Sequence, residues 1–357
     1  MDYSAVVNVR QKPHNHQVQL FESRDGATRS SARIAQLPLN AFPDFWVYAY
    51  LVLVDDYRVL IDTGSGFHKN NQHLEEGLIA AGELLGETID FADLTHIFIT
   101  HGHIDHFGGL PYLNGKTDAL IGVHELDQHN LTHTEERLTI IARRLERYLA
   151  EAGLNAATSQ EMVQIYKLTK LDYRPVKIDF TYEAAGMQVG PFEMLHVPGH
   201  CAGQVIIRLH DVLFSSDHVL AEISPHQAPE GLALFTGLSH YLQSLESARK
   251  WSEGIHLSLG GHNAPITNLN ARIQKIQDLH QERLGEFLDI LAEPHTIAEI
   301  SRKYFGEMHG YNILLALEEA GAHVEYLYER GQLEIANIKE VDNGGGLAPI
   351  RYRTLKS

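Results

Sequence analysis

A histidine-rich segment constrains the fold of this chain more than any other feature of its sequence. It directly follows the apolar run 96–100 and reads Thr100-His101-Gly102-His103-Ile104-Asp105-His106. Neutral imidazole and carboxylate groups are the usual nitrogen and oxygen ligands of zinc and similar transition metals. Because a loop with an internal glycine can turn such side chains in different directions, the segment predicts two adjacent metal ions. The alternative is a polar surface loop that is rich in histidine by chance. This interpretation is weaker, because four potential ligands directly follow an apolar run that is typical of a buried strand.

Three further candidate ligands share this placement, each just after a run of β-type residues. They are His200, Asp217 and His262, which follow the runs 192–197, 212–215 and 255–259. In layered α/β folds, sites are assembled from loops at one end of the strands. A lone histidine would be weak support, but these residues and the histidine-rich loop together form a set of seven candidate ligands.

Strand and helix patterns alternate over the first two-thirds of the chain. Further β-type runs cover residues 47–54, 58–61, 119–123 and 204–209, and helical spacing of apolar residues covers 74–85 and 242–251. This mixture predicts sheets covered by helices. Residues 131–170 have a different texture, with helices predicted at 134–152 and at 162–168, the second capped by Ser159. We interpret this segment as a helical insertion that serves packing, with a lid or substrate wall as the alternative.

The last part of the chain predicts a small separate module. A helix is expected at 270–292, followed by helices at 296–305 and 311–320 and by a hairpin of 324–328 with 333–335. Two helices and a hairpin resemble a winged-helix module. The expected organisation is therefore a catalytic domain over 1–269, a helix plus winged-helix-like module over 270–340, and a loosely ordered tail over 341–357.

The motifs of this chain resemble those of the metallo-β-lactamase superfamily. The resemblance rests on the H-x-H-x-D-H run at 101–106, on Asp62-Thr63-Gly64 after an early strand, and on His200, Asp217 and His262 in that order. It covers roughly residues 37–266. It implies an α/β fold, the αββα metallo-β-lactamase sandwich, with the metal ions at one edge of two packed sheets.

Carried over by position, the resemblance also assigns roles to single residues. A first metal ion would be bound by His101, His103 and His200, and a second by Asp105, His106 and His262, with Asp217 between them. Asp62 is similar to the supporting residue that orients the histidine loop, because outer carboxylates fix the tautomer and angle of a ligating histidine. The alternative for Asp62 is an ordinary turn aspartate.

Two such ions, about 3.5–4 Å apart, can share a water and lower its pKa to about 7. The expected reaction is attack of the bridging hydroxide on a carboxylic thioester or on a lactone or other ester, with Asp105 as a candidate proton carrier. Zinc is the expected metal, with iron or manganese as alternatives. His218 and His226 are candidates to line the substrate pocket.

Other functions remain open at this stage. Antibiotic-hydrolysing members of the superfamily generally lack the bridging carboxylate, so Asp217 argues against them. A persulfide dioxygenase with a single iron resembles the same motif set. A nuclease or phosphodiesterase is a weaker alternative, and a DNA-binding protein that uses the winged-helix-like module is weaker still.

The charge and composition of the chain argue against some of these alternative functions. The 29 Lys and Arg residues against 46 Asp and Glu residues give a formal charge of −17, which repels phosphate backbones and anionic membranes. Cys201 is the only cysteine, so neither an internal disulfide nor a thiolate zinc cage is possible. Residues 1–17 lack the basic start and apolar core of a signal peptide, and no apolar run reaches about 18 residues, so we expect neither a signal peptide nor a membrane span. We therefore expect a cytoplasmic enzyme that acts on a small-molecule substrate and has no nucleic-acid or membrane partner. A homodimer is compatible with the sequence.

Overall fold

Strand β3 (Phe45–Val54) shows how the sequence builds the centre of the molecule. Successive side chains of a strand point to opposite faces of its sheet, and both faces of β3 are buried. One face contributes Val47, Ala49, Leu51 and Leu53 to a core under α1 (Asn70–Leu85). The other face contributes Tyr48, Tyr50, Val52 and Val54 to a second core between two sheets. The structure, a computed structural model, describes residues 17–26, 31–67, 69–170, 174–343 and 348–355.

The first sheet has seven strands in chain order, antiparallel from β1 to β4 and parallel from β4 to β7. Besides β3 they are β1 (Gln19–Arg24), β2 (Ser31–Phe42), β4 (Tyr57–Ile61), β5 (His96–Phe98), β6 (Leu120–Val123) and β7 (Phe180–Thr181). The second sheet has the order β12-β11-β10-β9-β8, and only its β11–β12 pair is parallel. These strands are β8 (Gln188–Val189), β9 (Phe192–His196), β10 (Val205–Leu209), β11 (Val212–Ser216) and β12 (Leu257–Gly260).

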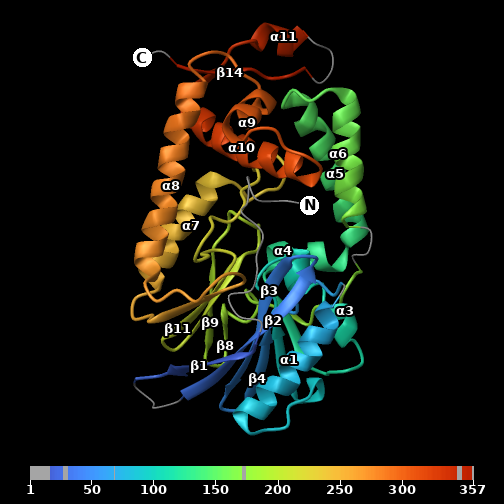
Figure 1. Cartoon of the computed structure of the whole chain (residues 1–357), viewed down its shortest axis with the longest axis vertical. Coiled ribbons are helices and arrows are strands. Elements are labelled where there is room, and N and C mark those ends of the chain that lie inside the picture. Colours follow the sequence, from blue (N-terminus) through green and yellow to red (C-terminus); the bar gives the residue numbers. More distant parts are fainter. Residues whose placement is uncertain (1–16, 27–30, 68, 171–173, 344–347, 356–357) are drawn as a thin grey trace.

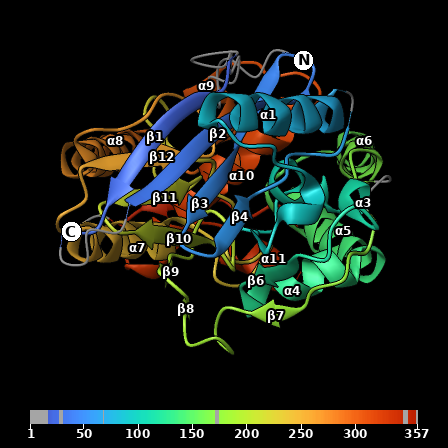
Figure 2. The ribbon, with the colours of Figure 1, turned by 90° about the horizontal axis from the view of Figure 1, so that it is seen from below.

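Helices cover the outer face of each sheet. Figure 2 shows α1 across the first sheet, and α7 (Leu238–Trp251) and α8 (Leu269–Ile290) lie beside the second (Figure 1). Between the sheets, Phe98 of β5 meets Phe192 of β9 with ring centroids 5.3 Å apart. Shorter helical segments connect the strands: η1 (Phe91–Asp93), α2 (Ile104–Phe107), α3 (Leu110–Leu113) and α4 (Glu125–Thr132). The predicted αββα sandwich is confirmed.

The helical insertion is present as α5 (Thr134–Glu151) and α6 (Ala156–Leu168). Asn155, rather than Ser159, caps α6, because its side chain accepts a hydrogen bond from the backbone N–H of Thr158 at 2.9 Å. The helix therefore begins six residues before the predicted 162–168. The two helices stand on the opposite side of α10 (Tyr311–Glu329) from α8 (Figure 1).

The predicted hairpin near the C-terminus is wrong. Residues 324–328 continue α10, which ends at Glu329, and their apolar side chains extend the buried helical face of Leu317 and Ala320. A short apolar run fits either a strand or a buried helix, and the packing of the whole helix decides. Strand β13 (Leu333–Ile335) pairs instead with β14 (Tyr352–Thr354).

The rest of the C-terminal part also departs from a winged helix. Helix α9 (Ile297–Phe305) begins with a capping box of Thr296 and Glu299, and α11 (Ile338–Asn343) lies between β13 and β14. The tail is not loosely ordered at 348–355, since β14 pairs with β13 and with His295. Residues 344–347, also assigned to this tail, lie outside the described residues. Over the described ranges, no helix has the length and apolar character needed to cross a membrane.

Candidate metal centre

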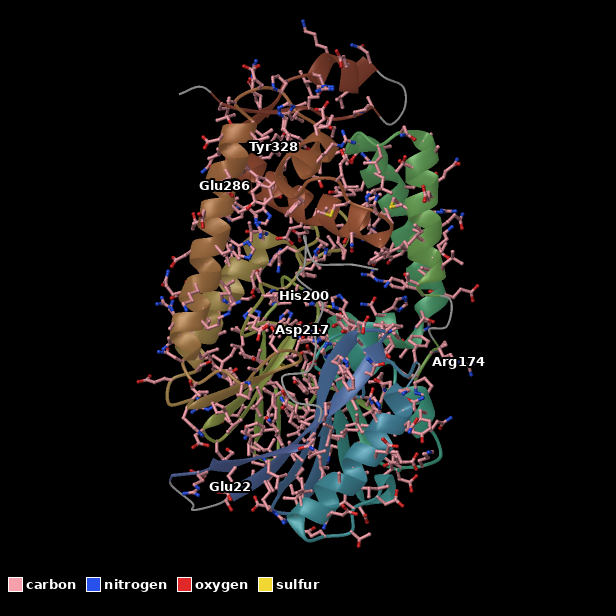
Figure 3. All side chains as sticks on the ribbon, viewed as in Figure 1. Glu22, Arg174, His200, Asp217, Glu286 and Tyr328 are labelled. Carbon is pink, nitrogen blue, oxygen red and sulfur yellow. The ribbon has the colours of Figure 1, made fainter. Side chains whose placement is uncertain are left out.

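The candidate ligands gather at the end of the sandwich that faces the C-terminal helices. His101, His103, Asp105 and His106 follow β5, and α2 begins inside this loop. His200 lies between β9 and β10, Asp217 directly follows β11, and His262 lies just beyond β12. Figure 3 shows His200 and Asp217 next to each other at this end, below α10.

All seven predicted ligands fall into two adjacent groups. The first ligand group is His101, His103 and His200, and the second ligand group is Asp105, His106, Asp217 and His262. Within each group, one potential ligating atom per residue lies within 4.8 Å of the others. The first ligand group contains the three residues expected at the first metal site, and Asp217, expected between the two sites, falls in the second group.

Asp217 lies where a carboxylate could contact an ion in either group. Its Oδ2 is 3.8 Å from Nε2 of His200 in the first group. The same oxygen is 3.5 Å from Nε2 of His106 and 3.3 Å from Nε2 of His262. Among the described residues, Asp217 Oδ1 and Nε2 of both His106 and His200 are buried without a hydrogen-bond partner. Buried polar atoms are rarely left unpaired, so these residues fit a bound cation well.

Hydrogen bonds on the far side of the imidazole rings fix which nitrogen faces the centre. Nδ1 of His200 donates to the carbonyl oxygen of His226 at 2.7 Å. Nδ1 of His262 donates to the carbonyl oxygen of Trp46, also at 2.7 Å. Each bond leaves Nε2 directed toward the ligand groups, which sets tautomer and ring orientation before any ion binds.

Asp62 holds the histidine loop from behind. Its carboxylate accepts hydrogen bonds from the backbone N–H and the hydroxyl of Thr100, both at 2.8 Å, and from Nδ1 of His106 at 2.7 Å. The side chain is 2% exposed and its backbone has a positive φ of 60°. The contacts are those of a residue that orients His106 rather than binds metal.

Asp127 on α4 is a second buried carboxylate at the centre, and its role was not predicted from the sequence. Its Oδ2 accepts a hydrogen bond from the backbone N–H of Gly102 at 2.7 Å, between two ligands of the first group. The thiol of Cys201, next to His200, donates to the same carboxylate at 3.3 Å. Asp127 therefore connects both loops that carry the first ligand group. A short polar helix gave no signal that this aspartate is buried.

We expect Asp127→Asn to weaken metal binding in the first ligand group by about 10- to 100-fold, the usual cost of losing an outer support of a metal site. The asparagine amide would turn a donor toward N–H and S–H donors, so at least one loop would be released. Titration of metal-free protein against a chromogenic chelator resolves the two affinities. Glu125→Gln, an exposed change on the same helix, should leave both unchanged. Wild-type affinity at both sites in Asp127→Asn would contradict the assignment.

The two ligand groups differ in electrostatics. Burial lowers the pKa of His101, His103 and His200, so their lone pairs are available at neutral pH. Burial also opposes protonation of His262, but Asp217 and Asp105 outweigh it and raise the pKa of His262 to about 9. Burial likewise opposes protonation of His106, but the charges of Asp217 and Asp62 outweigh burial and raise the pKa of His106. In the metal-free protein the second group therefore holds protons that the first group does not.

Metal binding in the second ligand group should consequently release protons at pH 7, whereas binding in the first should release almost none. A pKa raised to about 9 means that His262 is protonated at pH 7, and a ligating nitrogen must lose that proton. Affinity at the second group should rise with pH at least to about 9, because His262 and His106 must both lose a proton. Calorimetric titration in buffers of different ionisation enthalpy counts the protons. Equal proton release at both groups would contradict this assignment of charge.

A cavity of about 1680 Å³ adjoins the two ligand groups. Its lining includes His103, Asp105, His200, Asp217 and His262, and it extends to α5, α6 and α10. Of the two predicted pocket residues, His226 is part of this lining. His218 is not among the described residues that line it, because its side chain is fully buried with its ring centroid 5.4 Å from that of Tyr241.

Comparisons with known proteins agree with this geometry. Over about 90% of this chain and 98% of the other, the fold is similar to a metallo-beta-lactamase family protein from Thermus thermophilus (TM-score 0.69, 24% identity). It is also similar to a beta-lactamase domain protein from Burkholderia ambifaria (TM-score 0.62, 20% identity, 97% and 94% of the two chains). A probable metallo-hydrolase of Bacillus subtilis, YqjP, is 23% identical over 79% of this chain and 87% of its own length. The sequence profile of the metallo-beta-lactamase superfamily matches residues 44–262, which include all seven candidate ligands. The chain belongs to the metallo-β-lactamase superfamily.

Proposed function

We propose that this chain is a metal-dependent hydrolase with two metal ions, and that it cleaves carboxylic thioesters, lactones or other esters. The observation that carries the proposal is the position of Asp217. Its Oδ2 lies within 3.8 Å of a nitrogen ligand from the first group and within 3.5 Å of two from the second. A single carboxylate oxygen between two ligand sets suits two ions that share one bridging ligand.

Different residues of the site would contribute to different parts of the hydrolysis. Two divalent ions held here would lower the pKa of a shared water to about 7, which supplies hydroxide at neutral pH. Asp217 would fix the spacing of the two ligand groups. Asp105 lies at the same place, with Oδ2 3.5 Å from Nε2 of His262. The charges of His106 and His262 overcome burial and lower the pKa of Asp105 to about 2, so this side chain is a negatively charged candidate ligand at neutral pH.

Charge favours a small carboxylic substrate over a nucleic acid. The formal charge is −17, and a phosphodiester backbone needs several cations to bind. The cavity beside the ligands carries both signs of charge, with Asp44, Glu135 and Glu318 among its carboxylates and with Arg137, Arg143, Lys167 and Lys170 as its cations. A neutral thioester or ester carries no charge that these groups would repel.

The test combines metal content with turnover. Elemental analysis of the purified protein should give two zinc-like ions per chain, and a panel of thioesters, lactones and aryl esters should include at least one hydrolysed class. Removal of metal with a chelator should abolish turnover, and addition of zinc should restore it. One iron per chain with oxygen uptake on a persulfide, and no hydrolysis, would replace the proposal with a dioxygenase. Cleavage of RNA or of a phosphodiester in place of esters would also overturn it.

A further inference from the structure

The cavity beside the metal centre has an apolar floor and a charged rim. Its buried apolar side chains include Leu145 of α5, Val163 of α6 and Leu232, which are 1%, 8% and 4% exposed. The charged side chains Glu135, Arg143 and Glu146 also line it but are exposed to solvent. The boundary between these two sets lies on α5 itself. An apolar ligand group would therefore be covered at this floor, whereas Arg137, Lys170 and Glu318 are half-buried charged residues elsewhere in the lining.

The helical insertion and α10 supply this floor from opposite sides. Leu138 and Ile141 face the cavity from α5, and Leu315 faces it from α10. Figure 1 shows α5 and α6 rising from the sandwich beside one end of α10. The insertion is therefore more than a packing element, because it forms one wall of the space that contains the ligand groups.

From this arrangement we infer that the substrate is an ester or thioester with a long apolar acyl chain. The inference rests on the proposed function and names its substrate class. The metal ligands and the apolar floor line one continuous cavity of about 1680 Å³, larger than the roughly 300–1,000 Å³ of an ordinary small-ligand pocket. With the reacting carbonyl at the ligand groups, the acyl chain lies along α5 toward Leu145 and Val163, and the leaving group faces the charged rim.

Two adjacent isoleucines on α5 provide a matched pair for the test. Ile141 lines the cavity and is half-buried. Ile140 is 46% exposed and is not among the described cavity-lining residues. The same substitution at both positions changes the same residue type on the same helix, so only its position relative to the cavity differs.

The first measurement is kcat/KM for p-nitrophenyl esters from acetate to decanoate. We expect an increase of about fourfold per added methylene, the factor associated with burying one methylene group, until the floor is filled. Ile141→Trp should reduce decanoate turnover more than tenfold while acetate turnover changes little. Ile140→Trp should leave both unchanged. Leu138→Trp is a second cavity variant in case Ile141→Trp does not fold, as judged by circular dichroism.

A binding measurement separates this inference from the proposed function. Decanoate binding to metal-free protein is measured by displacement of a fluorescent fatty acid, in wild type and in the same variants. Tight binding that Ile141→Trp weakens, without hydrolysis of any ester, would support the acyl-chain site and remove the proposed function. Ester hydrolysis without dependence on chain length would keep the function and overturn the acyl-chain site. Failure of decanoate to bind to the wild-type protein would overturn the site as well.

Discussion

Asp217→Asn should lower kcat/KM for the best ester substrate by about 10³-fold or more. Charge stabilisation by a metal pair contributes several kcal/mol, and each ~1.4 kcal/mol corresponds to a factor of ten in rate. The asparagine side chain keeps the size of Asp217 but loses its negative charge, so it cannot neutralise two cations between His200 and His262. We expect one metal ion per chain in the variant, as measured by elemental analysis.

The controls for this variant separate chemistry from folding. Asp118→Asn removes an exposed carboxylate away from the candidate ligands and should retain wild-type turnover and metal content. Circular dichroism should show an intact fold for both variants. Full activity of Asp217→Asn with two ions bound would show that the bridging role is wrong.

Glu319→Ala should destabilise the protein by about 3–5 kcal/mol, the cost of leaving one partner of a buried ion pair uncompensated. Glu319 of α10 pairs with Arg283 of α8, and their side chains are 5% and 13% exposed. The same carboxylate accepts a hydrogen bond from the backbone N–H of Gln227 at 2.8 Å. Removing it leaves a buried guanidinium without its partner and releases the loop next to His226. Urea unfolding of metal-free protein measures the change.

A residue further along α10 gives a matched comparison. Glu325 also accepts hydrogen bonds from backbone N–H groups, of Glu230 at 2.7 Å and Gly231 at 3.2 Å, but none of the ion pairs among described residues includes it. Glu325→Ala should therefore cost only about 1 kcal/mol. The double variant Arg283→Met/Glu319→Leu should recover much of the loss, because an apolar pair of similar size needs no desolvation of charge. Equal losses at Glu319 and Glu325 would rule out the ion pair as the cause.

The candidate ligands were predictable because each lies just after a strand, and the apolar residues that predict each strand are neighbours in the sequence. His101 and Asp217 could be placed at a sheet edge without any knowledge of the rest of the fold. Asp127 could not, because its role depends on Gly102 and Cys201, which meet it only after the chain has folded. Nothing in its immediate neighbours distinguishes it from an exposed helical aspartate.

The missed and mistaken elements have the same origin. Strand β2 contains Pro38, which cannot donate to a ladder and suggests a break in the strand, but β1 pairs only with residues 31–36 and Pro38 pairs on one side, with Tyr48 of β3. Its place between β1 and β3 is decided by burial of Leu37 and Leu39, two residues of the core under α1. At the other end, α10 continues through Val324 because Leu317 and Ala320 extend the same buried face. In both cases tertiary packing outweighs the local preference.

The hydrogen bond from His200 to the carbonyl of His226 has a consequence for the order of events during synthesis. The loop that presents this carbonyl is itself held by Glu319, through the N–H of Gln227. While the chain is still emerging from the ribosome, His200 and the loop at His226 are made before Glu319 of α10. His200 then lacks the support that orients its ring. We expect the first ligand group to take up metal only after translation has passed residue 319, so that a nascent chain cannot be a fully loaded enzyme.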